Sequence, residues 1–162
     1  MREFDSYGLK LCEFQANLFE KSVEKTECSS PIFLRRFMKS NLAERMDGDG
    51  FLFEAIDDNG ALIEIECEFG KSNYGKTKFS ENEMYWIGYI YRYWAYIREI
   101  SSKKVYHMVK PDELRKLYFP YHSLDPLQAI ERIEESKELR DEDMIKKGTV
   151  ILRNVRKKYA SK

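Results

Sequence analysis

The stretch from Ser80 to Ile100 holds the densest group of large aromatic and aliphatic residues in the chain. Ser80, followed three positions later by Glu83, forms a capping-box pattern, which predicts that a helix begins at about residue 81. At 100° per residue, the apolar side chains of this helix cover more than half of its circumference. A helix of this kind has to lie at the centre of a fold. We therefore expect the other segments to pack around residues 81–100.

The less apolar side of this predicted helix carries Arg92 close to Gly88, where another backbone can approach. A glycine in a helix interior costs about 1 kcal/mol relative to alanine, which indicates that the close approach is useful. One interpretation is a contact inside the monomer, with a buried Arg92 paired to an acidic residue such as Glu99. The other is a partner surface, because interfaces favour tyrosine and arginine. We predict the partner surface, anchored by Tyr85, Arg92 and Tyr96.

Length and charge limit the class of protein. The chain has 162 residues, with 28 basic and 28 acidic side chains, so no overall field draws it to nucleic acid or membrane. We expect one globular domain over residues 1–138 and an appendage over 139–162 that carries a basic tail. Three cysteines without metal-type spacing favour reduced thiols, and no signal peptide or long apolar run is present. We expect a cytoplasmic protein without a membrane span.

Helical spacing of apolar residues predicts amphipathic helices over 7–23 and over about 30–45, the second opened by Ser30 and Pro31. Shorter helices are expected over 103–109 and 112–118, and another follows Pro126, with Asp125 as its N-cap. Residues 149–155 are expected to form either a strand or a short helix, and their β-branched residues favour the strand.

Residues 51–69 predict a β-hairpin. Asn59-Gly60 is a strong hairpin-turn signal, and the segment after it alternates apolar residues with Glu64, Glu66 and Glu68. The expected fold class is therefore α+β, mainly α-helical, with helices around the aromatic-rich helix at 81–100 and one hairpin at 51–69.

Two groups of basic residues are candidates for anion or nucleic-acid binding, although each is also typical of a solvated surface. The first lies on the outer side of the helix at 30–45, and the second lies in the tail. A helix-turn-helix after Ser101 would accompany them, but its candidate recognition segment offers only Arg115 and Lys116 as basic donors. The residues of the two groups are Arg35, Arg36 and Lys39, and Arg153, Arg156, Lys157 and Lys158.

Three local patterns resemble chemical sites without completing them. Residues 47–50 lack the ligand spacing of a calcium loop and its closing glutamate, since Asp58 stands at the twelfth position. The string GxxxxGKT occurs at 70–77, but the predicted helix begins at Ser80 and not at the lysine. His122 beside Asp125 is the best local acid–base pair, and a turn before a helix explains both residues equally well. We predict no catalytic residues, no metal site and no cofactor.

Three segments, NEMYWIGYIYRYW, SSKKVYHMVKP and LRKLYFPYHSLDPLQAIERI, resemble a family of small uncharacterised bacterial proteins. These are encoded in gene clusters that look like toxin–antitoxin or defence loci, some beside ADP-ribosyltransferase-like proteins. The resemblance spans about residues 29–133 and implies a neutralising or regulatory partner in such a locus. Its motifs centre on Tyr85, Trp86, Gly88, Tyr91, Arg92, Tyr93, Trp94, Lys110, Pro111, Tyr118, His122, Asp125 and Pro126.

The sequence thus favours a non-enzymatic component that binds a protein partner, and we expect this partner to be a neighbouring gene product. A nucleic-acid-binding transcriptional regulator is the first alternative, and a small nucleotide-dependent enzyme using His122 or the loop at 70–77 is the second.

Overall fold

In a computed structural model, which describes residues 1–160, the chain forms eight α-helices and one 3-10 turn, with no strand among these residues. The fold is all-α, so the predicted α+β class is wrong. The elements in chain order are α1 (Ser6–Lys25), α2 (Ser30–Met38), α3 (Asn41–Asp47), η1 (Phe51–Phe53), α4 (Asp58–Phe69), α5 (Glu81–Arg98), α6 (Ser102–Met108), α7 (Pro111–Tyr121) and α8 (Pro126–Ala160).

The chain divides into two compact units, Met1–Pro126 and a second unit that begins at Leu127. The sequence placed this division after Glu138. No helix over residues 1–160 has both the length and the apolarity needed to cross a bilayer.

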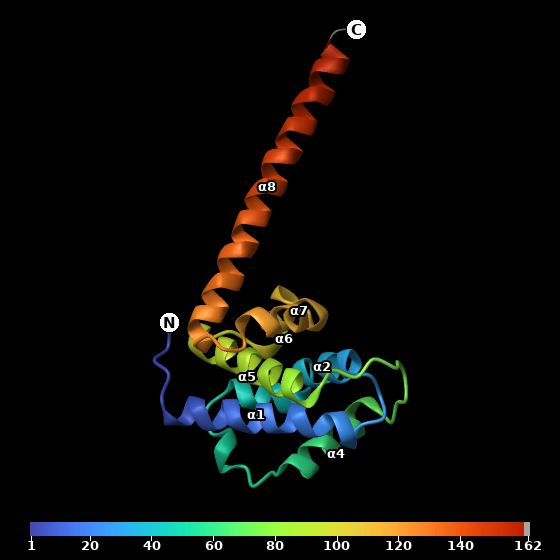
Figure 1. The fold of residues 1–162 in the computed structure, drawn as a ribbon, viewed down its shortest axis with the longest axis vertical. Coiled ribbons are helices and arrows are strands. Elements are labelled where there is room, and N and C mark those ends of the chain that lie inside the picture. The colour runs from blue at the N-terminus through green and yellow to red at the C-terminus, as the bar shows by residue number, and fades with distance from the viewer. Residues whose placement is uncertain (161–162) are drawn as a thin grey trace. The chain divides into compact units, whose positions relative to one another are not determined.

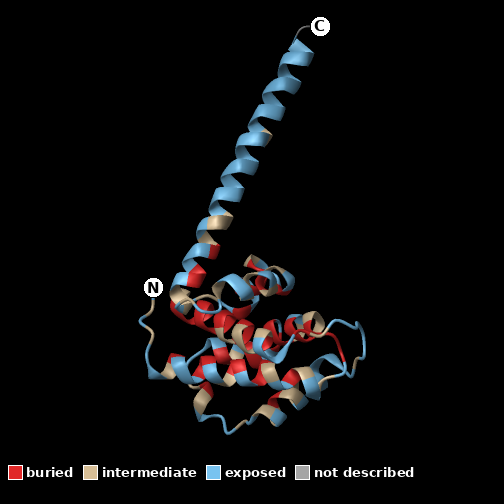
Figure 2. Cartoon of the chain, in the orientation of Figure 1, coloured by how far each residue is buried: buried red, intermediate tan, exposed pale blue. Residues whose placement is uncertain are grey.

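α5 is the centre of the first unit, as its sequence predicted. It packs along α1 and contacts α6 and α7, so it lies between α1 and the pair α6–α7 (Figure 1). The capping box forms as expected, because the Glu83 amide donates to Ser80 Oγ at 3.1 Å and the Ser80 amide donates to Glu83 Oε1 at 3.3 Å. Buried residues concentrate on these helices, whereas α8 beyond its first turns is exposed (Figure 2).

Gly88 lets α1 and α5 approach closely. A Cβ atom added at Gly88 would lie 2.9 Å from the carbonyl oxygen of Gln15 and 3.0 Å from Cα of Ala16. The Gln15 side chain uses this proximity, since its Nε2 donates to the Gly88 carbonyl at 3.0 Å. The inference that another backbone approaches at Gly88 is confirmed, and that backbone belongs to the same chain.

The predicted hairpin is a helix, α4, because a cap outweighs the local turn signal. Asp57 accepts a hydrogen bond from the Gly60 amide at 2.8 Å, which places Asn59-Gly60 in the first helical turn. Ala61 and Ile65, four residues apart, are the buried residues of this helix. A period of four, not of two, therefore matches the burial.

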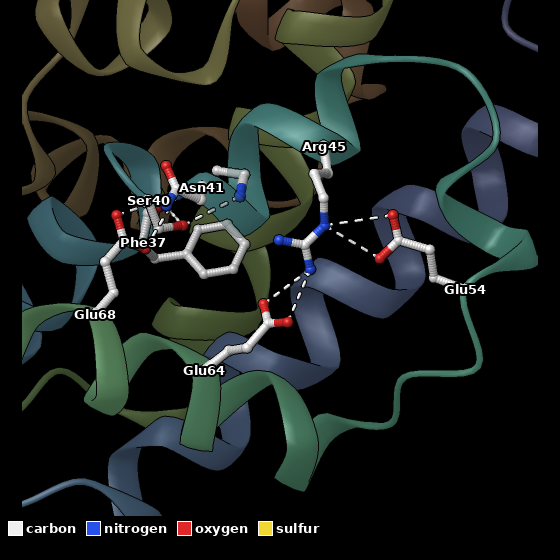
Figure 3. Close-up of polar contacts among 8 residues, drawn as sticks. Phe37, Ser40, Asn41, Arg45, Glu54, Glu64 and Glu68 are labelled. Carbon is white, nitrogen blue, oxygen red and sulfur yellow. Dashed lines mark hydrogen bonds and ion pairs between the residues drawn. The ribbon is translucent and has the colours of Figure 1, made fainter.

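The glutamates of the supposed acidic strand instead hold α4 against α3. Arg45 Nη2 donates to Glu64 at 2.8 Å, while Arg45 Nε donates to Glu54 at 3.1 Å (Figure 3). Glu68 accepts from the Asn41 amide at 3.0 Å, at the start of α3. These contacts join residues that are distant in sequence, so period-two alternation did not reveal them.

Two other boundaries differ from the prediction. The helix expected over 30–45 is divided into α2 and α3, because Ser40 Oγ accepts from the Ala43 amide at 3.1 Å and starts a new helix. The strand favoured over 149–155 is wrong, since these residues belong to α8. β-propensity reflects packing on a sheet, and no neighbouring strand exists over the described residues.

We expect the substitution Gly88→Val to lower the free energy of unfolding by about 2 kcal/mol, because the added side chain would overlap the α1 backbone. The matched control is Gly148→Val, since an added Cβ at Gly148 meets nothing within 4 Å. Urea unfolding of both variants measures the difference. Equal stabilities would contradict the close packing of α1 on α5.

Candidate interaction surfaces

Arg92 is the hub of a buried polar cluster that joins four helices. Its side chain is 1% exposed and donates to Gln15 Oε1 on α1 at 2.8 Å. It also donates to Asp47 Oδ1, the last residue of α3, at 2.7 Å, and to Ser102 Oγ, the first residue of α6, at 2.8 Å. Asp47 accepts in addition from the Ser102 amide at 2.8 Å. The Asp47 carboxylate therefore does two things: it pairs with the Arg92 guanidinium, and it accepts from a backbone amide in the first turn of α6 that has no partner within that helix.

The structure therefore places Arg92 in a contact inside the monomer, which is one of the two interpretations that the sequence left open. Its acidic partner is Asp47, not Glu99, which is exposed at the end of α5. Tyr96 is 7% exposed and Tyr85 is half-buried. The burial of Arg92 and Tyr96 removes two of the three residues of the predicted partner surface from the accessible surface.

Sequence reasoning missed the residues that surround Arg92. Asp47 was considered only as part of a calcium-like loop, and its carboxylate serves Arg92 and Ser102 instead. Gln15 is a long polar side chain on the mainly apolar buried face of α1, and that exception was the available signal. A buried amide at such a position needs a hydrogen-bonding partner.

We expect Arg92→Ala to lower the free energy of unfolding by about 3 kcal/mol or more, because the Asp47 carboxylate would lose its counter-ion. Thermal and urea unfolding measure this loss. Arg115→Ala is the control, since its pair with Glu83 at 2.6 Å involves an arginine that is 39% exposed. A stable Arg92→Ala protein would contradict the structural role.

Asp5 caps α1 and also binds Tyr96. Its Oδ1 accepts from the Gly8 amide at 2.8 Å and from the Tyr96 hydroxyl at 2.7 Å, and these bonds lower the pKa of Asp5. Burial raises the pKa of Tyr96 to about 12, and its hydrogen bond to Asp5 acts in the same direction. The N-terminal segment is thereby fixed to α5.

Because folding lowers the pKa of Asp5, its ionised form stabilises the protein above the unfolded value of about 4, and this contribution disappears as the pH falls through the lower folded value. Asp5→Asn keeps a capping oxygen but does not titrate. We expect wild type and variant to differ most above about pH 4 and to converge in stronger acid. A pH series of urea unfolding curves measures the difference, and a constant gap would contradict this assignment.

The basic group on α2 is partly engaged within the fold. Arg36 donates to the Gly70 carbonyl at 2.6 Å, and the Lys39 ammonium lies 5.4 Å from the centroid of the Tyr106 ring. Arg35 is exposed. The tail group, Arg153, Arg156, Lys157 and Lys158, is exposed on α8, in the other unit of the chain. Binding of nucleic acid by either group stays a prediction.

The segments with possible chemistry have structural partners. Arg115, one of two basic donors on α7, bonds Glu83 and lies 4.4 Å from the centroid of the Phe79 ring. The His122 ring stacks on Tyr118, with centroids 4.7 Å apart, and its Nδ1 lies 3.0 Å from the Tyr118 carbonyl oxygen. His122 therefore packs against the C-terminal end of α7.

The GxxxxGKT loop pairs with the start of α2 rather than leading directly into a helix. The Ser29 amide donates to the Tyr74 carbonyl at 3.0 Å, and the Ser30 amide donates to the Thr77 carbonyl at 2.9 Å. α5 begins at Glu81, beyond the lysine of the motif. In the part of the chain that the structure describes, no group of three or more His, Cys, Asp or Glu residues is placed to hold a metal.

A cavity of about 380 Å³ opens between the end of α1, α2, α4 and the segment after α4. Phe33, Leu62 and Ile65 give it an apolar lining, and Arg36 and Glu66 add opposite charges. The lining contains no histidine and only one cysteine, Cys28.

The second half of α8 carries the main exposed apolar surface of its unit. We call it the α8 stripe: Met144, Ile145, Gly148, Ile151, Leu152, Val155 and Tyr159. At 100° per residue these seven positions fall within an arc of about 120°. The six with large side chains are between 45% and 72% exposed. A continuous apolar arc on a helix normally faces another protein element, so the α8 stripe is the best candidate for a docking surface.

Comparisons with known proteins give no relative for this chain. No protein-family model, no curated protein and no solved structure matches it.

Proposed function

We propose that this chain is a non-enzymatic interaction component, and that the α8 stripe is the surface by which it docks to a protein partner. The exposed apolar arc of α8 carries this proposal. The six large side chains are exposed in the isolated chain, and burying their apolar surface would favour association. Covering the arc is therefore a strong driving force for association.

The first unit supports the proposal as a folded base. Its aromatic helix, its arginine and its conspicuous loops have internal partners, as described for Arg92, Arg115 and the segment 70–77. We place the protein in a reducing compartment, the cytoplasm, because its three cysteines are free thiols. The partner that we propose is the product of a neighbouring gene, which fits an antitoxin-like or regulatory role in a bacterial toxin–antitoxin or defence locus.

Co-expression of the full chain with each neighbouring gene product, followed by purification and size-exclusion chromatography, tests the proposal. We expect one product to co-elute with the chain. Val155→Asp should lower the affinity by at least about tenfold, because it places a carboxylate in the apolar arc. Asn154→Asp is the matched control, since it adds the same charge at the adjacent position on another side of α8.

Failure to retain any neighbouring gene product would contradict the proposal. Equal loss of binding in Val155→Asp and Asn154→Asp would show that charge, not the apolar arc, controls association.

One observation favours the regulator as a second candidate. Residues 144–160 contain six basic side chains and no acidic one, which provides a charge suited to phosphates. A mobility-shift assay with the promoter of its own gene, at low and high salt, tests this function. Binding to that DNA at low salt, lost at high salt, would support it, and no shift at low salt would eliminate it.

A further inference from the structure

We infer that the α8 stripe is built for an acidic helix: a partner helix whose apolar face is bordered by aspartate or glutamate. This inference rests on the proposed function and adds the chemistry of the partner. It follows from the charges beside the stripe, from the width of the stripe and from its central glycine.

Both borders of the α8 stripe are basic. On the helical wheel, Arg156 follows Ile145 by about 20° on one side, and Lys158 precedes Ile151 by about 20° on the other. Lys147 lies next to Lys158 on that second border. Residues 144–160 contain no aspartate or glutamate. A helix that packs on the stripe would place its own border residues opposite these cations.

Charge disfavours a second copy of the chain as the occupant. In a pair of helices, the residues that border the apolar seam face each other across the interface. In an antiparallel pair of this segment, Lys147 and Lys158, which lie on the same border, would face each other across the interface. Like charges at such positions oppose association, whereas carboxylates would favour it.

The stripe also fits a helix better than a lipid surface. Its arc of about 120° is typical of a helix that packs on protein, and Tyr159 is its one aromatic residue, whereas helices that lie in a membrane interface favour Trp and Phe. Gly148 lies within the arc. The other two glycines inside long helices, Gly8 and Gly88, each face a neighbouring group, namely the Tyr96 ring and the α1 backbone. Gly148 has no such neighbour within 4 Å, which leaves room for a partner.

The test uses designed probes, so it does not depend on identifying the natural partner. The first is a helical peptide of about three heptads with leucine at the a and d positions and glutamate at e and g, and the second has lysine at e and g. Vesicles of phosphatidylglycerol and phosphatidylcholine form a third probe. We expect the full chain to bind the glutamate peptide at least about tenfold more tightly than the lysine peptide, and more weakly as salt rises.

Two variants with the same change in net charge show whether the borders are responsible. The double substitution Lys147→Glu and Arg156→Glu reverses the borders, and Lys146→Glu with Arg153→Glu reverses charges on the opposite side of α8. We expect the border variant to lose binding of the glutamate peptide by about tenfold and to gain binding of the lysine peptide. The control variant should change both by less than about threefold.

The inference fails if the glutamate peptide does not bind or if the two double variants have equal effects. It also fails if the chain binds the vesicles more tightly than the peptide. Dimers of the chain that dissociate on the Val155→Asp substitution would overturn it as well. The two proposals fail separately. A neighbouring gene product that binds through the stripe while the glutamate peptide does not would leave the proposed function intact and reject the acidic helix. If the glutamate peptide binds but no neighbouring gene product does, the proposed function is rejected and the acidic helix stands.

Discussion

The ion pair between Arg92 and Asp47 is the interaction on which the first unit depends. Burying a guanidinium is expensive unless it is paired and its remaining donors are hydrogen-bonded, and here Gln15 and Ser102 complete the set. The four residues come from α5, α3, α1 and α6, so the cluster requires these helices to meet in one arrangement. We infer that the need to pair and hydrogen-bond this guanidinium helps to fix how the four helices pack.

Because α1 packs closely on α5, a side chain of α1 can reach the Arg92 cluster. Gly88 removes the side chain that would separate the two helices, and Gln15 then reaches both the Gly88 carbonyl and Arg92. The second unit is organised differently. Most of α8 beyond Ile133 makes no buried contact among the described residues, and its apolar arc is in solvent. The chain thus combines a folded unit, in which the buried Arg92 is paired and hydrogen-bonded, with a helix whose apolar arc is exposed. This contrast is the observation on which the proposed docking role of α8 rests.

Much of the all-helical unit was predictable from local signals, and the exceptions have physical causes. The capping box at Ser80, the proline at the start of α2 and the position of Pro126 each marked a helix start correctly. α4 was missed because Asn59-Gly60 and the alternating glutamates also fit a hairpin, and only the cap at Asp57 and the distant Arg45 resolve the choice. Arg92 was assigned to a surface because its partners Asp47 and Gln15 lie 45 and 77 positions away, beyond any local pattern. The α8 stripe was missed because β-branched residues at 149–155 indicated a strand.

The central claim is that the first unit is closed by its own contacts while the α8 stripe remains uncovered until a partner binds. Hydrogen exchange of the isolated full chain, followed by mass spectrometry, measures this directly. Amides of α5 at the Arg92 cluster should exchange slowly, near the rate set by global unfolding, and amides over 144–160 should exchange orders of magnitude faster. Slow exchange over 144–160 in the dilute, isolated chain would show that the stripe is already covered and would contradict this account.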